Sequence, residues 1–133
     1  MKYLLDTHSF LWVLFDDEKL SEKVKEIVRN PRNEIYTSVI TYWEISLKYS
    51  IGKLELEGIS PDELPIKAQE IGIETLEISA EETSSFYKLP KIKHKDPFDR
   101  LIIWQAIKRN IVLISKDEEM NNYKEFGLSL LWK

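Results

Sequence analysis

The chain of 133 residues contains no cysteine. Disulfides, zinc–thiolate sites and thiol catalysis are therefore excluded, and any bound metal must be held by oxygen or imidazole ligands. Glycine and proline are scarce, at four and five residues, and neither an internal repeat nor a low-complexity stretch is present. At 43% hydrophobic residues the chain is long enough for one substantial core but short for two. We therefore expect a single domain over residues 1–133.

Long apolar runs are lacking as well. No segment approaches the roughly 20 apolar residues of a membrane-spanning helix. The first residues resemble a signal peptide only faintly, because Asp6 and His8 interrupt the apolar stretch and no small-residue cleavage site follows. We expect a soluble, cytoplasmic protein.

Positive charge is in the minority, yet it is concentrated in one part of the chain. The net charge is −4, but residues 86–116 contain eight Lys or Arg against two acids, which leaves −10 for the remainder. An acidic chain argues weakly against broad nucleic-acid binding. The basic window is either an ordinary solvated surface or the rim of a site that binds a polyanion.

Hydrophobic periodicity and breaker residues predict strands that alternate with helices. Strands are expected at residues 3–5, 34–38, 75–78, 111–114 and 128–132, and helices at residues 9–15, 21–30, 39–51, 61–71, 80–88, 97–109 and 118–123. This order predicts an α/β fold, a three-layer α/β/α sandwich with a central, mostly parallel sheet. Such sheets bind ligands beyond the carboxyl ends of their strands.

Two aspartates follow predicted strands. Asp6 comes directly after the strand at 3–5, and Asp117 comes shortly after the strand at 111–114. In a parallel sheet both lie at the same edge and are candidates for one site. A structural alternative stands beside this reading, because Asp is a favoured N-cap of the helix that follows.

Glu44 interrupts an apolar helix face. The apolar residues of that face are Ile40, Leu47 and Ile51. Burying an unpaired carboxylate is costly, so a cation close to Glu44 explains its position well. The alternative is a surface pair of Glu44 with Lys48, which would contribute only about 0.3–0.5 kcal/mol.

Residues 96–99 have the pattern of a helix start. Asp96 is placed as the N-cap and Pro97 at the first helical position, which accounts for both. Asp99 instead continues into the face of Ile102 and Ala106, which is expected to pack on the sheet. A carboxylate at the head of a buried face suits a metal site.

The remaining residues of chemical interest have weaker patterns. His8 and His94 each stand alone, without the paired spacing of a histidine metal site, and are expected to be structural or to contact substrate. The four tryptophans, at positions 12, 43, 104 and 132, lie in apolar surroundings and are expected in the core or in a dimer contact rather than stacked on bases.

Five motifs, taken together, resemble the VapC-like branch of the PIN-domain ribonucleases, the toxins of type II toxin–antitoxin pairs. They are LLDTH (residues 4–8), YWEI (42–45), GKLEL (52–56), HKDPFDRLIIWQA (94–106) and VLISKD (112–117). Their order and spacing span nearly the whole chain, and DPFDR in that context is the most specific element.

The resemblance implies a metal-dependent endoribonuclease that hydrolyses RNA phosphodiester bonds with Mg²⁺ or Mn²⁺. It also implies a homodimer and a cognate antitoxin protein that blocks the site. The acids that match the family's metal-binding and catalytic positions are Asp6, Glu44, Asp99 and Asp117. Residues expected in the shell of the site are Asp96, Arg100 and Ser115, which stands where Thr is common, and His94 matches the extended motif. Residues expected to contact RNA phosphates are Lys48, Lys53, Lys93, Lys95, Arg100 and Lys116.

Two other functions remain open at this point. One is a degenerate PIN domain that binds protein or RNA without cleavage, and the retention of all four acids counts against it. The other is a phosphoryl-transfer domain, such as a receiver or a haloacid-dehalogenase-like phosphatase. Asp6 lacks the second Asp of the phosphatase Asp-x-Asp motif, and Lys116 with Asp117 does not reproduce the arrangement of a receiver.

Overall fold

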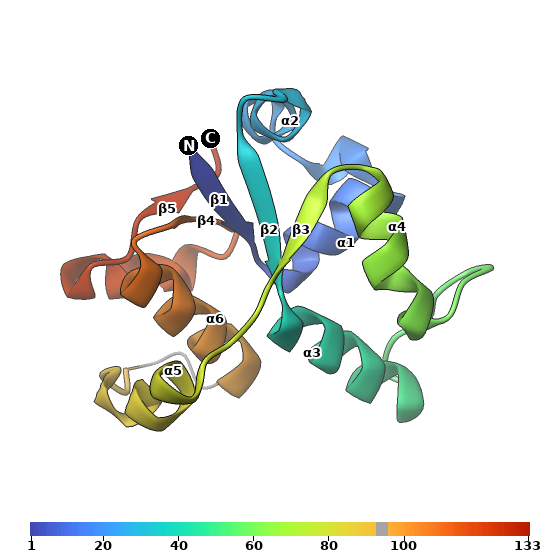
Figure 1. Cartoon of the computed structure of the whole chain (residues 1–133). Coiled ribbons are helices and arrows are strands. Elements are labelled where there is room, and N and C mark those ends of the chain that lie inside the picture. Colours follow the sequence, from blue (N-terminus) through green and yellow to red (C-terminus); the bar gives the residue numbers. More distant parts are fainter. Residues whose placement is uncertain (93–95) are drawn as a thin grey trace.

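The computed structural model describes residues 1–92 and 96–133. In this part of the chain, five strands form one parallel sheet in the order β3-β2-β1-β4-β5 (Figure 1). The strands are β1 (Lys2–Leu5), β2 (Glu34–Ser38), β3 (Ile73–Leu76), β4 (Val112–Ile114) and β5 (Leu130–Leu131). Every pairing between neighbouring strands is parallel, so the expected, mostly parallel sheet is confirmed.

Helices connect the strands and cover the sheet. The α-helices are α1 (Thr7–Phe15), α2 (Glu22–Arg29), α3 (Val39–Ser50), α4 (Leu64–Glu70), α5 (Ala80–Ser85) and α6 (Pro97–Arg109). Shorter 3₁₀ segments are η1 (Asp17–Lys19), η2 (Pro61–Glu63), η3 (Phe86–Lys88) and η4 (Glu118–Phe126). Among the described residues, no helix combines the length and the apolar character that a membrane crossing requires.

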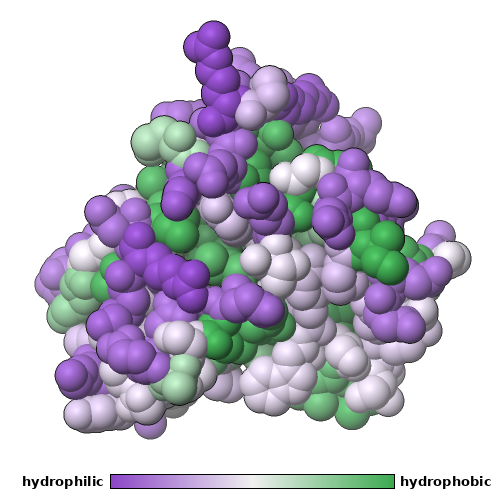
Figure 2. Space-filling view, viewed as in Figure 1, coloured by the Kyte–Doolittle hydropathy of each residue, from purple (hydrophilic) through white to green (hydrophobic). Residues whose placement is uncertain are grey.

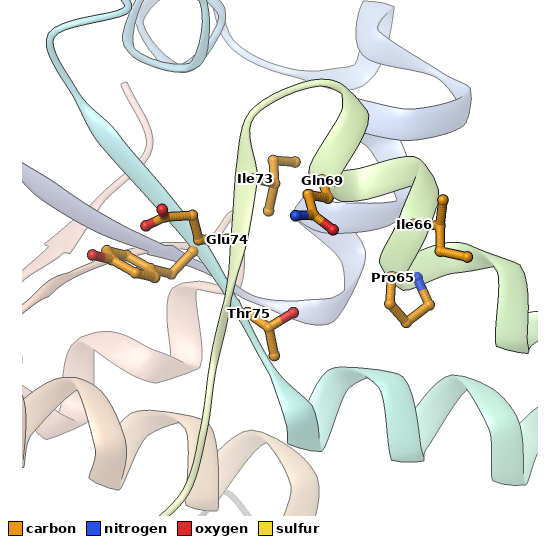
Figure 3. Close-up of a pocket in the computed structure, with 7 residues that line it drawn as sticks. Pro65, Ile66, Gln69, Ile73, Glu74 and Thr75 are labelled. Atoms are coloured by element: carbon orange, nitrogen blue, oxygen red, sulfur yellow. The ribbon is translucent and has the colours of Figure 1, made fainter.

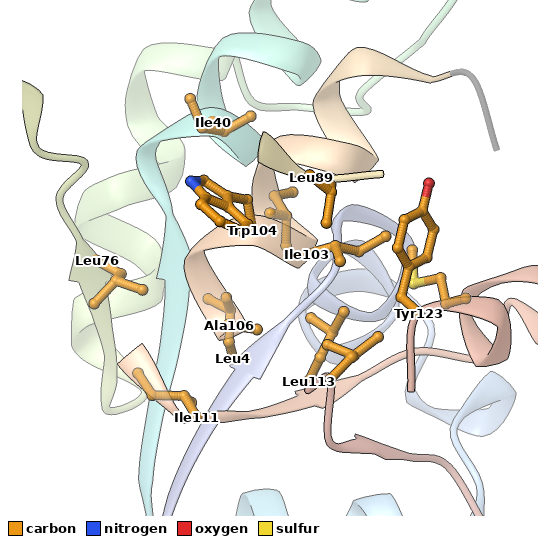
Figure 4. Close-up of a cluster of buried hydrophobic side chains, with 13 residues drawn as sticks. Leu4, Ile40, Leu76, Leu89, Ile103, Trp104, Ala106, Ile111, Leu113 and Tyr123 are labelled. Atoms are coloured by element: carbon orange, nitrogen blue, oxygen red, sulfur yellow. The ribbon is translucent and has the colours of Figure 1, made fainter. Parts of the chain in front are cut away.

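Alternation along the strands creates two hydrophobic layers, one on each face of the sheet. Leu4 of β1 and Leu113 of β4 pack under α6 and η4, in the layer that also contains Trp104 (Figure 4). Leu5 and Ile114 point to the opposite face and pack with residues of α1, α2 and α4. Both faces are therefore covered, and the predicted α/β/α architecture is confirmed.

Several element boundaries differ from those expected; β5, for example, covers only 130–131 of the expected 128–132. The first helix begins at Thr7 rather than at residue 9, because the Asp6 side chain accepts a hydrogen bond from the Ser9 amide and caps it. β3 covers 73–76 rather than 75–78, since Gly72, with φ of 88°, leads the chain from α4 directly into the strand. The segment after β4 is a 3₁₀ helix that continues to residue 126.

The tryptophans divide between core and surface. Trp104 is buried, and the rings of Trp12 and Trp132 pack edge to face, with centroids 5.8 Å apart. Trp43 is 58% exposed, so of its two expected positions, core or dimer contact, the core is excluded. On the face seen in Figure 2, hydrophilic side chains surround smaller hydrophobic areas.

Candidate active site

The first candidate site residues lie at the topological switch point of the sheet, where the connections from neighbouring strands leave in opposite directions. β1 is central: β2 and β3 lie on one side of it, and β4 and β5 lie on the other. A crevice beyond the carboxyl ends of the strands forms at such a point, here between β1 and β4. The Asp6 amide donates a 3.1 Å hydrogen bond to the carbonyl of Ile114, which places Asp6 beside the end of β4.

The Asp6 carboxylate is buried, with 4% of the residue exposed. Its Oδ1 accepts a 2.8 Å hydrogen bond from the Ser9 amide, and its Oδ2 accepts a 2.6 Å hydrogen bond from Ser115 Oγ. Burial raises the pKa of Asp6, although hydrogen bonds from Ser115 and Ser9 and the charge of His8 act to lower that pKa. No Lys or Arg in the described part of the chain forms an ion pair with this carboxylate.

Asp117 is coupled to Asp6 through Ser115. The Asp117 amide donates a 3.1 Å hydrogen bond to Ser115 Oγ, the same hydroxyl that donates to Asp6. Asp117 also caps η4, because its Oδ1 accepts from the Glu119 amide at 3.0 Å. Both aspartates are therefore N-caps, as the structural alternative predicted. Both also lie at the same edge of the sheet, as expected.

The two aspartates line one shallow pocket of about 400 Å³. The other residues of its wall are His8, Trp12 and Lys116. The Lys116 ammonium lies 6.0 Å from the centroid of the Trp12 ring, so one positive charge borders the acidic floor. His8 is exposed at the entrance, in keeping with a substrate contact rather than a core position.

Glu44 is buried beside the residue that follows Asp6. Its Oε1 accepts a 2.6 Å hydrogen bond from Thr7 Oγ1, and its Oε2 accepts a 2.5 Å hydrogen bond from the Lys48 ammonium. The alternative of a Glu44–Lys48 pair is therefore realised, but not as a surface pair, because Glu44 is only 3% exposed. Leu47 and Ile51 are exposed, so the expected apolar face is buried only in its first part.

Asp96 and Asp99 open the helix that faces α3. Asp96 Oδ1 accepts hydrogen bonds from the amides of Phe98 and Asp99, at 2.9 and 3.1 Å, which confirms its N-cap role. The Phe98 ring lies 5.1 Å from the ring of Trp43 on α3. Asp99 lies half-buried in the first turn of α6, and its charge and that of Asp96 both act on Lys48.

The basic residues expected to contact RNA have different environments. Lys53 is exposed and Lys116 borders the pocket, whereas Lys48 is engaged by Glu44. Arg100 donates to the carbonyls of Leu89 and Pro90, and its guanidinium lies over the Phe86 ring. Through these contacts Arg100 holds residues 86–90 against the start of α6. The predicted residues Lys93, His94 and Lys95 lie outside the described residues.

Two of the contacts that organise the site were not foreseen. Thr7 joins the acid after β1 to the acid of α3, and Thr41 also contacts the Thr7 hydroxyl at 3.1 Å. A hydroxyl residue directly after Asp6 is the signal that the sequence offered for Thr7. A separate pocket of about 490 Å³ lies between α4 and β3 and contains none of the predicted site residues (Figure 3).

The predicted acids lie as two pairs. Ser115 links Asp6 to Asp117, and Lys48 lies among the charges of Glu44 and Asp99. Within 1–92 and 96–133, no three Asp, Glu or His side chains are close enough together to hold a metal ion. The donors nevertheless fit Mg²⁺ or Mn²⁺, because they are carboxylate oxygens and the buried Asp6 pairs with no Lys or Arg of residues 1–92 and 96–133, so a divalent cation would supply that charge.

Comparison with known proteins identifies the family. A family model of the PIN domain matches residues 3–125. The chain belongs to the PIN-domain family. PIN domains are typically nucleases. A comparison with curated proteins finds no match.

Solved structures with the same fold match the chain over nearly its full length. VapBC2 from Rickettsia felis, solved in complex with a DNA fragment from the promoter of VapBC2, is similar at a TM-score of 0.70 and 20% identity over 100% of both chains. VapBC-1 from nontypeable Haemophilus influenzae is similar at a TM-score of 0.68 and 20% identity, over 98% of this chain and 97% of that one. DNA-bound VapBC from Salmonella typhimurium gives 0.61 and 18%, over 98% and 97%. At these identities the likeness establishes the fold.

Proposed function

We propose that this PIN domain is a metal-dependent endoribonuclease that hydrolyses RNA phosphodiester bonds. The observation that carries the proposal is the buried Asp6 carboxylate at the switch point between β1 and β4. It is joined to Asp117 through Ser115 and has no Lys or Arg partner in the described part of the chain. A carboxylate kept there without a counter-charge is costly for folding alone. Its position is well explained by a bound cation.

Four acids would supply the ligands for one or two ions: Asp6 and Asp117 as one pair, and Glu44 and Asp99 as the other. When bound, Mg²⁺ or Mn²⁺ supplies a water of lowered pKa and neutralises charge on the phosphate. The residues of the chain position these ligands: Ser115 orients Asp6, and Thr7 orients Glu44. Asp117, which lines the pocket, would bind metal or orient the attacking water.

The RNA strand would lie over the pocket and along the basic window. Lys116 borders the acids and Lys53 is exposed, so both are available to phosphates. Lys93 and Lys95 are proposed on sequence alone. Phosphate contacts of this kind position a strand without reading its bases.

The same proposal makes the protein the toxin of a VapBC-type pair. The structures that it resembles are described as VapBC complexes, which supports a cognate antitoxin as partner. We also propose a single domain over residues 1–133 that forms a homodimer in the cytoplasm. Exposed Trp43 remains a candidate for a dimer contact.

The test is RNA cleavage by the wild type and by Asp99→Asn, with Mg²⁺ or Mn²⁺ and with chelator. Asp62→Asn is the matched control, because it removes the same charge from an exposed 3₁₀ segment. We expect cleavage by the wild type and the control only when metal is present, and loss of at least about 100-fold in Asp99→Asn, the scale of a lost group that stabilises the transition state. Equal cleavage by Asp99→Asn rejects the assignment of the site.

The binding-only alternative predicts another result. A degenerate PIN domain would form a salt-sensitive complex with RNA but cleave no member of a broad RNA panel, even with metal. Mapping the cut sites of the wild type and Asp99→Asn side by side distinguishes the two functions.

A further inference from the structure

The charge of Glu44 is matched inside the protein. The Lys48 ammonium donates to Oε2 at 2.5 Å, and the Thr7 hydroxyl donates to Oε1 at 2.6 Å. The Glu44 side chain is 4% exposed, whereas that of Lys48 is 35% exposed. Both carboxylate oxygens therefore already have donors from the chain, and one of the donors is a cation with partial access to solvent.

Lys48 also interacts electrostatically with the acids at the start of α6. Burial by itself would lower the pKa of Lys48, but the hydrogen bond and charge of Glu44, with the charges of Asp96 and Asp99, raise it. The ammonium thus lies in the field of acids from two facing helices. A divalent cation is attracted to the same field, and two cations held by one carboxylate repel each other.

Burial explains why this place needs a cation at all times. An ionised carboxylate left inside a protein without a counter-charge is strongly destabilising. Asp6 has no Lys or Arg partner among the described residues, whereas Glu44 has Lys48. The Lys48 stem extends from the same helix, four residues along, so the ammonium can leave Glu44 for solvent without a change of the fold.

We propose that Lys48 is the resident counter-ion of Glu44 in the metal-free protein and competes with the divalent cation for this carboxylate. The inference rests on the proposed function, and it gives Lys48 a role other than the RNA contact expected from the sequence. Lys48 supplies the positive charge beside the buried Glu44 side chain and so stabilises the metal-free site. By the same contact it weakens metal binding and sets the free metal concentration at which the site fills.

The experiment measures Mn²⁺ binding by titration calorimetry and the melting temperature in chelator, for the wild type and Lys48→Met. Lys48→Met should bind Mn²⁺ about tenfold more tightly, a change that corresponds to about 1.4 kcal/mol. In chelator the same variant should melt at a lower temperature than the wild type, because Glu44 loses its counter-charge. Lys67→Met is the matched control, since it removes an exposed lysine from α4, which carries none of the proposed site residues, and should change neither quantity.

Three further variants separate charge competition from damage to α3. Lys48→Gln, whose amide still donates a hydrogen bond, is a second neutral variant in case Lys48→Met does not fold without metal, and it should also bind Mn²⁺ more tightly. Lys48→Arg keeps the charge and should bind like the wild type. The double variant Glu44→Gln with Lys48→Met makes the pair neutral and should recover the melting temperature lost in Lys48→Met.

The outcomes distinguish this inference from the proposed function. Metal binding by the wild type, with unchanged or weaker binding by both neutral variants, overturns the competition while leaving the nuclease proposal intact. Failure of the wild type and of all variants to bind Mn²⁺ overturns the metal-dependent function, and the inference with it. Tighter binding by both neutral variants, with unchanged binding by Lys48→Arg, supports the competition.

Discussion

Ser115 Oγ donates a 2.6 Å hydrogen bond to Asp6 Oδ2 and accepts one from the Asp117 amide at 3.1 Å. The residue after β4 therefore holds the carboxylate that follows β1 and the backbone of the next candidate acid. Asp6, Ser115 and Asp117 all lie at the switch point between β1 and β4. The Ser115 hydroxyl therefore links the two acids of this pair.

Ser115→Ala should lower both stability and RNA cleavage. It leaves the buried Asp6 with one hydrogen bond fewer, a loss of about 1.5–3 kcal/mol for a bond to a charged group. Ser115→Thr keeps the hydroxyl and should behave like the wild type. Urea denaturation and cleavage rates measure the two effects, and an alanine variant equal to the threonine variant would show that the hydroxyl is dispensable.

Asp6→Asn should abolish cleavage but stabilise the metal-free protein at neutral pH. Burial raises the folded-state pKa of Asp6, so the folded state takes up a proton more readily than the unfolded state. Ionised Asp6 therefore opposes folding above its folded pKa, and that opposition disappears as the pH falls through the folded pKa. Asn retains the N-cap function. Urea denaturation in chelator should show an advantage of Asp6→Asn at pH 7 that shrinks in acid; lower stability at pH 7 would contradict it.

Glu82→Gln should reduce stability at neutral pH by about 2 kcal/mol, the scale of hydrogen bonds between charged groups. Glu82 accepts from Arg109 Nε at 2.7 Å and from its terminal nitrogen at 2.8 Å, and this pair joins α5 to α6. The Arg109 hydrogen bond is the main cause of the lowered pKa of Glu82, so the stabilisation is present at neutral pH and is lost as the pH falls through that pKa. The wild type and Glu82→Gln should converge in acid.

The neighbouring pair provides the control for Glu82. Glu81 and Lys108 also join α5 to α6, at 3.0 Å, but both side chains are substantially exposed. Glu81→Gln should therefore change the free energy of unfolding by less than about 1 kcal/mol. Equal losses in the two variants would show that burial of Glu82 does not matter.

Gln105→Leu should destabilise the fold and disturb the distance between the helices that carry Glu44 and Asp99. The fully buried Gln105 accepts a 2.5 Å hydrogen bond from Ser38 Oγ, at the start of α3, and donates to the carbonyl of Glu77. Leucine leaves the Ser38 hydroxyl without this acceptor, a loss of about 1–3 kcal/mol. Urea denaturation measures it, with the exposed Gln69→Leu as control; an unchanged midpoint in Gln105→Leu would argue against the bond.

Much of the fold follows from local sequence patterns. Apolar runs and cap residues predict each strand and helix, and Asp6, Ser21 and Asp96 occupy N-cap positions in the structure. The boundaries that were missed depend on context. β3 has exposed Glu74 and Thr75 between two buried residues, so it lacks the alternation or continuous apolar run that marks a strand.

The sequence indicates which residue types form the candidate site but not their contacts. The parallel order of strands implies that Asp6 and Asp117 share an edge, and they do. No local pattern shows that Arg100 is turned toward Leu89, that Trp43 is exposed, or that α3 is covered only in its first part. Those features depend on which other elements pack against each helix.

The sequence by itself determined the order of strands and helices and the presence of acids after β1 and β4, because capping and hydrophobic periodicity act over a few residues. Only the tertiary structure decided how those acids are held. Ser115 reaches Asp6 across 109 positions of the chain, and Thr7 reaches Glu44 across 37. The Glu44–Lys48 pair could be buried or lie at the surface. Which of the two occurs depends on the neighbouring elements that exclude water from Glu44. Charge compensation inside a protein is a property of packing between distant segments, so it becomes visible only in the folded chain.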